Sequence, residues 1–164
     1  MVTFKGNAVS LKGKTLNVGD KAPKIDLVAK DLSIKSVGGA SGKYQVINVV
    51  PSLDTGVCAT QTRKFNEEAA SLANTQVFVV SLDLPFAQGR FCSTEGIENV
   101  EALSDFRKKA FGEAYGVVLD GSPLEGLLTR AVFVVNPQGE IVYKEIVAEI
   151  TTEPNYQSAL GAIK

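Results

Sequence analysis

Hydrophobic and polar residues alternate at the very start of the chain. Val2 and Phe4 lie before Gly6-Asn7, and Val9 and Leu11 lie after it. Alternation on both sides of a turn signal is typical of two antiparallel strands. We therefore predict an amino-terminal β-hairpin that lies over one end of the fold.

Further along, the pattern predicts a strand, a helix and a second strand in succession. Tyr44 to Val50 (YQVINVV) is apolar on both faces, as in a strand that is covered on both sides of a sheet. From Cys58 to Ala73 the apolar residues recur at steps of three and four, which places them on one face of a helix. Gln76 to Leu82 (QVFVVSL) is again largely apolar. Two such strands joined by one helix form a right-handed unit with parallel strands.

Shorter segments complete the predicted order of elements. The expected strands are Ile25–Ala29 and Ser33–Val37, followed late in the chain by a hairpin of Ala131–Val135 and Ile141–Val147. The expected helices run from Pro85 toward Cys92, over Leu103–Phe111, and onward from Glu153 and Pro154. The segment Gly112–Ser122 is expected to be largely loop, with an apolar patch at Val117–Leu119.

A parallel unit followed by a hairpin and a closing helix is the element order of the thioredoxin architecture. Here it carries an amino-terminal extension and an insertion between its two halves. We expect one α/β domain over residues 1–164, with a mixed central sheet flanked by helices. A fold of this kind does not by itself identify a function.

The composition excludes several classes of function. Seventeen basic and eighteen acidic residues give a net charge of -1, so we expect no binding to nucleic acid or to a membrane surface. The chain has no histidine, which excludes Ser-His-Asp and Cys-His catalysis, histidine metal sites and histidine-bound haem. Its two cysteines are too few for a four-thiolate zinc or iron–sulfur site. We expect neither a metal nor another cofactor.

The amino-terminal residues show neither the apolar core nor the cleavage pattern of a signal peptide, and no stretch reaches the roughly 18 apolar residues of a membrane span. We therefore expect a cytoplasmic protein. In the reducing cytoplasm a disulfide is more often a transient step in a reaction than a structural link. The two cysteines are then either buried core residues or a redox pair.

The loop between the first parallel strand and its helix reads PSLDTGVC and ends at Cys58. Cysteine reacts as the thiolate, and a free pKa near 8.5 leaves little of it ionised at neutral pH. The N–H groups at the start of a helix stabilise an anion by about 0.3 to 2 kcal/mol, so a nearby cation is needed as well. The candidates are Arg63, further along the same helix, and Arg130, at the start of a strand that we expect beside this loop.

Two other residues of the loop can serve the same chemistry. Thr55 is within N-cap range of the helix, and its hydroxyl can bond either the helix start or a bound oxygen. Pro51 can fix the direction of the loop and shield the thiol. Since Cys58 has to meet an external molecule, we expect its sulfur to be accessible to solvent.

Together these residues form the pattern PxxxTxxC, the signature of the peroxiredoxins. The segment VINVVPSLDTGVCATQTRKFNE, the second cysteine in GRFCSTEGIENV and the later LLTRAVFVV resemble the thiol peroxidase subfamily, whose members are atypical two-cysteine peroxiredoxins. The resemblance runs the length of the chain and implies a thioredoxin-like, or peroxiredoxin, fold. It implies that Cys58 is the peroxidatic cysteine and Cys92 the resolving one, and that Pro51, Thr55 and Arg130 complete the site.

The resemblance also implies an enzyme that reduces hydroperoxides. Cys58 would be oxidised to a sulfenic acid, and Cys92 would condense with it to a disulfide within the chain. Thioredoxin would then reduce the disulfide, and the family's members pair as homodimers. Because the two cysteines lie on different predicted helices, we expect them to be apart in the reduced protein and to meet only after local unwinding.

Two alternatives remain open from the residues themselves. A thioredoxin-like disulfide exchange protein is disfavoured because the chain contains no CxxC pair. A non-catalytic interaction module on the same fold is disfavoured because it leaves PxxxTxxC unexplained. In isolation Cys58 would be read as a small buried hydrophobic residue, and Arg130 equally well as a surface charge at a strand end.

Overall fold

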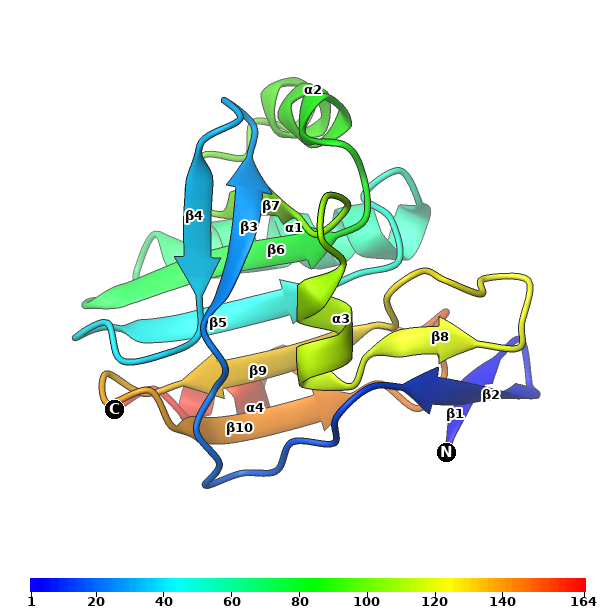
Figure 1. The fold of residues 1–164 in the computed structure, drawn as a ribbon. Helices are drawn as coiled ribbons and strands as arrows, with labels where there is room; N and C mark the ends of the chain where they lie inside the picture. Colours follow the sequence, from blue (N-terminus) through cyan, green and yellow to red (C-terminus); the bar gives the residue numbers. More distant parts are fainter.

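A computed structural model describes all 164 residues as two β-sheets and four helices (Figure 1). The strands of the central sheet are β3 (Ile25–Ala29), β4 (Ile34–Val37), β5 (Tyr44–Val49), β6 (Thr75–Ser81), β7 (Glu101–Ser104), β9 (Ala131–Val135) and β10 (Ile141–Ile146). The smaller sheet contains β1 (Val2–Phe4), β2 (Asn7–Lys12) and β8 (Val118–Asp120). The helices are α1 (Gly56–Ala69), α2 (Pro85–Glu95), α3 (Ala110–Tyr115) and α4 (Tyr156–Gly161).

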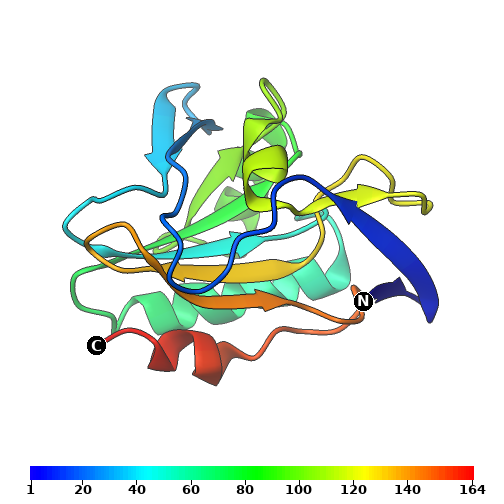
Figure 2. The same cartoon turned by 60° about the horizontal axis from the view of Figure 1, so that its bottom comes forward.

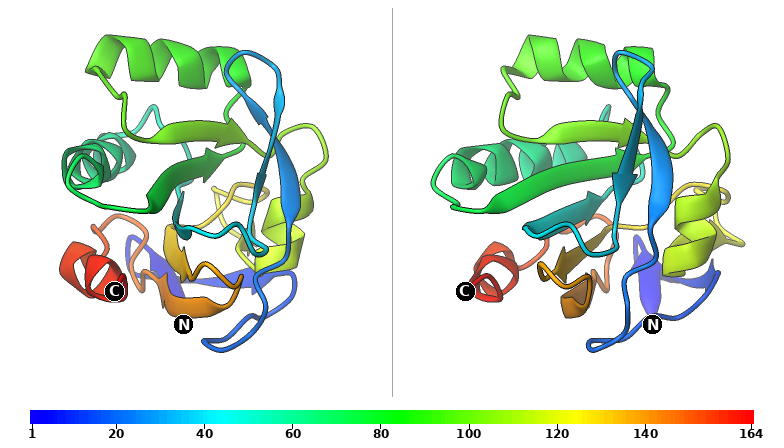
Figure 3. Two further views of the ribbon diagram at one scale, coloured as in Figure 1. Left: turned by 90° about the vertical axis from the view of Figure 1, so that its left-hand side faces the viewer. Right: turned by 60° about the vertical axis from the view of Figure 1, so that its left-hand side comes forward.

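The central sheet is mixed, with the strand order β10-β9-β5-β6-β7-β3-β4. Strands β5, β6 and β7 are parallel, whereas β9 and β3 run antiparallel to their neighbours in this group. Helices α1 and α4 lie side by side against one face of the sheet, and α3 lies on the other side (Figures 2 and 3). The predicted α/β fold, with a mixed sheet flanked by helices and an amino-terminal hairpin, is confirmed.

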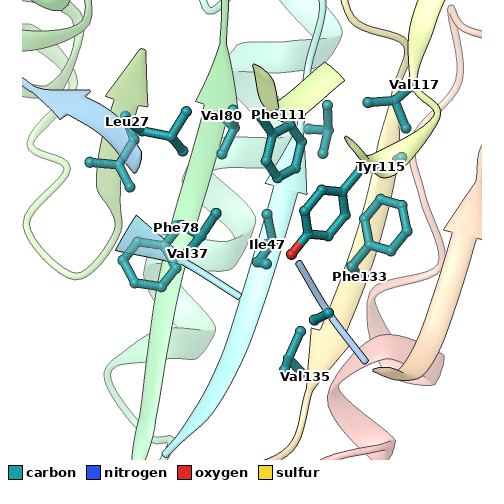
Figure 4. Close-up of a cluster of buried hydrophobic side chains, with 14 of the residues drawn as sticks. Leu27, Val37, Ile47, Phe78, Val80, Phe111, Tyr115, Val117, Phe133 and Val135 are labelled. Atoms are coloured by element: carbon teal, nitrogen blue, oxygen red, sulfur yellow. The ribbon is translucent and has the colours of Figure 1, made fainter. Parts of the chain in front are cut away.

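Each face of the central sheet has its own hydrophobic core, which explains why the central strands carry apolar residues on both faces. In β5, Ile47 and Val49 belong to the core on the α3 side, whereas Val46 belongs to the core on the α1 side. The core on the α3 side contains a stacked pair of rings, Phe111 and Tyr115, whose centroids are 4.2 Å apart (Figure 4). The core on the α1 side contains both cysteines.

The predicted hairpins and the parallel unit are present, with small shifts at their ends. The amino-terminal turn consists of Lys5 and Gly6, rather than Gly6-Asn7, because Phe4 pairs with Asn7. Both turn residues have positive φ, 50° and 83°, as a tight two-residue hairpin turn requires. The carboxy-terminal strands β9 and β10 pair antiparallel, and the last helix begins at Tyr156.

The helix expected over Leu103–Phe111 was wrong. Glu101–Ser104 is strand β7, which pairs with β6 on one side and β3 on the other, so its short apolar run is buried by sheet neighbours. The helix begins only at Ala110, where the Asp105 carboxylate accepts the N–H groups of Phe111 and Gly112, both at 3.0 Å. Asp105 lies several residues before the helix and not at its N-cap position. A sequence search for a residue at the N-cap position therefore does not find this cap.

The expectation that Gly112–Ser122 is largely loop was also wrong in part. Helix α3 continues to Tyr115, and the apolar patch at Val117–Leu119 leads into the three-residue strand β8. Strand β8 pairs with β2 of the amino-terminal hairpin, so a partner far away in the chain determines its conformation. None of the four helices has the length and apolar character needed to cross a membrane.

Candidate active site

The loop that leaves β5 at Pro51 turns into α1 so that Cys58 lies in the helix's first turn. Thr55 is the N-cap residue, with an extended backbone, and its carbonyl accepts the first helical hydrogen bond from Ala59 N–H at 2.9 Å. The N–H groups of the first turn have no partner within the helix and carry the positive end of its dipole. Cys58 is therefore placed where an anion is stabilised.

Arg130 supplies the cation that this position needs. It precedes β9, and because Ala131 pairs with Val49 at the end of β5, the arginine lies beside the loop that enters α1. Its Nη1 donates to Cys58 Sγ at 3.3 Å. Its Nε donates to the carbonyl of Ile150 at 2.7 Å, which fixes the orientation of the guanidinium plane.

Arg63, the other candidate cation, lies elsewhere. It pairs with Glu95 of α2 at 3.2 Å on the outside of the protein. Arg130, in contrast, is only 3% exposed, so its charge acts on the sulfur with little screening by water. Of the two candidates, only Arg130 is brought to Cys58 in this structure.

Gln61 is a member of this cluster that the sequence analysis did not identify. Its Oε1 accepts from Arg130 Nη1 at 2.9 Å, and its Nε2 donates to Asn48 Oδ1 at 3.2 Å. Asn48 in turn donates from Nδ2 to the carbonyl of Phe78 at 3.2 Å. Gln61 and Asn48 are fully buried, and the chain of hydrogen bonds ties the arginine to α1 and to the sheet.

A signal for this chain of hydrogen bonds was present in the sequence. Asn48 interrupts the apolar run YQVINVV, and Gln61 falls one turn after Cys58 on the buried side of the predicted helix. Buried polar side chains are nearly always hydrogen-bonded. Two such residues on neighbouring elements are therefore candidates for one network.

The hydroxyl of Thr55 does not cap the helix. It donates instead to the carbonyl of Ser52 at 3.0 Å, so its proton is engaged and its oxygen remains able to accept a hydrogen bond. The side chain is exposed, at the outer end of the loop, and Pro51 is buried at the end of β5. The loop therefore places a hydrogen-bond acceptor, the Thr55 hydroxyl oxygen, at the protein surface. Its first residue, Pro51, is buried at the end of the sheet.

The expectation that the Cys58 sulfur is accessible to solvent was wrong for this structure. Cys58 is 0% exposed, and Leu53 of the same loop, 2% exposed, belongs to the same hydrophobic cluster. The neighbouring Asp54, Thr55 and Gly56 are exposed. The thiol is therefore covered in this structure, and an external molecule reaches it only when the surrounding side chains move.

Cys92 has a different environment. It lies on α2, is 4% exposed, and burial raises the pKa of its thiol, although the charge of Lys30 acts in the opposite direction. A cavity of about 580 Å³ borders it, between α2, β6, β7 and the turn after β3. Both cysteines are free and on different helices, as the sequence predicts.

Helix α2 is the more exposed of the two helices that carry a cysteine. Only Pro85, Gln88 and Cys92 are buried along its eleven residues, and it ends at Gly96, whose backbone is left-handed with φ 66°. Nowhere in the chain do three or more carboxylate, thiol or imidazole groups gather closely enough to hold a metal ion. The chemistry that the arrangement offers is that of a cysteine sulfur beside a guanidinium group.

Comparison with known proteins agrees with this geometry. Residues 17–160 match the Redoxin family. The chain is 58% identical to the thiol peroxidase of Campylobacter jejuni subsp. jejuni over 94% of this chain and 87% of that protein. It is 51% identical to the thiol peroxidase of Halalkalibacterium halodurans, over 99% of this chain and 96% of the other.

A solved structure shares the fold closely. The crystal structure of a peroxiredoxin-like protein from Aquifex aeolicus superposes with a TM-score of 0.95 and is 51% identical. The match covers 98% of this chain and 93% of that one. The fold, the motif around Cys58 and these relatives agree, and the chain belongs to the thiol peroxidases of the Redoxin family.

Proposed function

We propose that this protein is a thiol-dependent peroxidase that reduces hydrogen peroxide to water and organic hydroperoxides to alcohols. The observation that carries the proposal is the 3.3 Å contact between Arg130 Nη1 and Cys58 Sγ at the start of α1. A buried guanidinium group and a helix amino terminus both favour the thiolate over the thiol. The thiolate is the form of cysteine that attacks a peroxide oxygen.

In the first step Cys58 Sγ forms a bond to one peroxide oxygen while the O–O bond breaks. The sulfur loses two electrons and becomes a sulfenic acid, and the leaving oxygen takes a proton and departs as water or alcohol. Arg130 and the first-turn N–H groups stabilise the charge that moves onto this oxygen. The Thr55 oxygen, whose own proton is bonded to Ser52, accepts the hydrogen bond of the incoming hydroperoxide. Pro51 keeps water away from the thiolate.

In the second step the Cys92 thiol attacks the sulfenic sulfur, an S–S bond forms and water leaves. The exposure of much of α2 supports local unwinding of this helix as the movement that brings the two sulfurs together. An external dithiol then reduces the disulfide, and the proposed reductant is thioredoxin in the cytoplasm. The role of this catalytic cycle is antioxidant defence.

We further propose that the protein works as a homodimer. Leu84 and Phe86, at the start of α2 and on the side of the molecule that carries the Cys58 loop, are 46% and 68% exposed. Large apolar side chains exposed close together are typical of surfaces that pair with another protein. Gel filtration with light scattering measures the assembly directly, and a monomer at micromolar concentration would exclude it.

Stopped-flow mixing of the reduced protein with one equivalent of hydroperoxide tests the function. A peroxidase of this kind loses both thiols rapidly and gains one disulfide. A disulfide exchange protein, the alternative function, responds to an added disulfide rather than to peroxide, and an interaction module responds to neither. Retention of both thiols in the presence of hydroperoxide would exclude the proposed activity.

A further inference from the structure

Asp83 lies in the loop between β6 and α2, and its carboxylate binds the loop that precedes Cys58. Oδ1 accepts from the Ser52 hydroxyl at 2.7 Å, and Oδ2 accepts from the Leu53 backbone N–H at 2.8 Å. Oδ2 also accepts from the hydroxyl of Ser81, at the end of β6, at 2.7 Å. One half-buried carboxylate thus joins two loops that are well separated in the chain.

The bonds continue from Asp83 to the residues that face the substrate. Ser52, bound to the carboxylate, offers its carbonyl to the Thr55 hydroxyl at 3.0 Å and its hydroxyl oxygen to the Asp54 N–H at 3.2 Å. The carboxylate therefore determines the conformation of the loop on which the position of the Thr55 oxygen depends. The same loop carries Leu53, which belongs to the same hydrophobic cluster as Cys58.

Asp83 is itself held firmly. Its own N–H donates to the Ser81 hydroxyl at 3.2 Å, and its carbonyl accepts from the Ser104 hydroxyl at 2.6 Å, so the ends of β6 and β7 support it. A rigid support is what a residue needs if it is to position another group within a fraction of an ångström. Helix α2, which carries Cys92, begins two residues later at Pro85.

We propose that Asp83 is a positioning residue for peroxide reduction. It holds the loop from Pro51 to Thr55 so that the Thr55 oxygen and the first-turn N–H groups keep a fixed geometry relative to Cys58 and Arg130. It touches neither the sulfur nor the substrate and acts through Ser52 and Leu53. This inference rests on the proposed peroxidase function and assigns a role to a carboxylate outside the PxxxTxxC motif.

The test compares two reactions of Cys58 in Asp83→Ala, Asp83→Asn and the unsubstituted protein, all carrying Cys92→Ser so that one thiol reacts. Oxidation by hydrogen peroxide needs the fixed loop, whereas alkylation by iodoacetamide needs only a reachable thiolate. Asp83→Ala is expected to slow the peroxide reaction by about 10- to 100-fold, the effect of a misplacement of about 1 Å. Its alkylation rate should not fall.

Asp83→Asn provides the rescue. Its amide oxygen can still accept from Leu53 N–H and the Ser81 hydroxyl, and its amide nitrogen can donate to the Ser52 oxygen. We expect its peroxide rate to lie within roughly fivefold of the unsubstituted protein, about one hydrogen bond's difference. If Asp83→Ala acted only by lowering the stability of the protein, its effect would not be limited to the peroxide reaction. Asp83→Asn would then not restore the peroxide rate.

A matched control removes a comparable carboxylate–serine contact far from the site. Asp26→Ala breaks the bond between Asp26 and Ser36 on the exposed hairpin of β3 and β4, and is expected to leave both rates unchanged. Should Asp83→Ala fail to fold, Ser52→Ala removes one bond only and is expected to slow the peroxide reaction by roughly fivefold.

The proposal is overturned if folded Asp83→Ala, or in its place Ser52→Ala, reacts with peroxide as fast as the unsubstituted protein. It is also overturned if alkylation slows in parallel with oxidation, because Asp83 would then act on the thiolate and not on loop geometry. A different result would exclude the proposed peroxidase function itself: the unsubstituted protein would then show no reaction with peroxide.

Discussion

The two cysteines are both buried, yet their surroundings are opposite in kind. Cys58 Sγ accepts a hydrogen bond from a guanidinium group that is itself fixed by Gln61 and the Ile150 carbonyl. Cys92 faces apolar neighbours, and burial raises the pKa of its thiol. Burial strengthens the effect of a charge in direct contact with a sulfur, and at Cys92 it disfavours ionisation more than the charge of Lys30 favours it. The contrast supports the proposal that Cys58 attacks peroxide and that Cys92 stays a neutral thiol until the site opens.

The two helices that carry these cysteines also differ, in how much of each helix is buried. Helix α1 buries Cys58, Gln61, Thr62 and Phe65 over fourteen residues, and Phe65 packs edge-on against Tyr156 of α4 with centroids 5.1 Å apart. Helix α2 has no comparable apolar face. This comparison supports the proposal that α1 keeps the reactive cysteine in place and that α2 moves to bring the second cysteine to it.

Exchange of each thiol for a hydroxyl gives the largest expected difference between the two sites. Cys58→Ser should abolish peroxide reduction, because no nucleophile remains beside Arg130. Cys92→Ser should still form one equivalent of sulfenic acid, and should lose only the turnover that depends on an external dithiol. Rapid-quench measurement of peroxide consumed per chain checks both, and equal full turnover in the two variants would contradict the assignment.

Arg130→Ala should make the surroundings of Cys58 resemble those of Cys92. Loss of the guanidinium removes the donor at 3.3 Å, and we expect the peroxide reaction to slow by about 100- to 1,000-fold, as for the loss of one buried donor in other active sites. Stopped-flow kinetics measures the rate, with Arg63→Ala as the control because Arg63 pairs with Glu95 instead. An unchanged rate would remove Arg130 from the site.

Gln61→Met tests whether the support behind Arg130 matters. The substitution keeps the volume but leaves Asn48 Oδ1 and one N–H of Arg130 without their partner, so we expect a loss of about 1 to 3 kcal/mol in the free energy of unfolding and a slower peroxide reaction. Urea unfolding and stopped-flow kinetics measure the two effects. Gln157→Met, on the exposed face of α4, is the matched control and should change neither.

How far the sequence could predict this site depends on the range of the contacts involved. Pro51, Thr55 and Cys58 stand in one loop, so their pattern can be read directly, and Arg130 follows from the antiparallel pairing of β9 with β5. The link from Asp83 to Ser52 joins residues of different loops, and no local spacing announces it.

The same distinction separates the correct elements from the incorrect ones. The strands β5, β6 and β9 are long, apolar and buried on both faces, so their pattern is unambiguous. Strand β8 has three residues and exists because β2 pairs with it, while α3 begins where Asp105 reaches back to cap it. The burial of Cys58 was missed because it depends on how the residues of its hydrophobic cluster pack, which the motif does not specify.

The smallest expected effect concerns acid and the segment that supports Arg130. Glu149 accepts from Gly6 N–H at 2.9 Å, from Thr3 and from Thr151, and the hydrogen bond of the Thr151 N–H is the main cause that lowers the pKa of this carboxyl to about 2. It thereby ties the amino-terminal hairpin to the segment whose Ile150 carbonyl holds the arginine.

Because the pKa of Glu149 is lower in the folded chain than its ordinary value of 4.5, its contribution to stability is complete above about pH 4.5 and is lost as the pH falls toward 2. Thermal unfolding midpoints should therefore fall over this interval, and less steeply in Glu149→Gln. Glu125→Gln, an exposed substitution, is the control and should keep the full slope. Parallel curves for Glu149→Gln and the unsubstituted protein would contradict this role.

The most direct test of the contrast between the two sulfurs is the rate at which the single remaining thiol reacts with hydrogen peroxide at neutral pH in Cys92→Ser and in Cys58→Ser. We predict that the first variant, which keeps Cys58 beside Arg130, reacts rapidly and forms one equivalent of sulfenic acid. The second, which keeps Cys92, should react far more slowly, because burial raises the pKa of that thiol. Equal rates in the two variants would contradict the account.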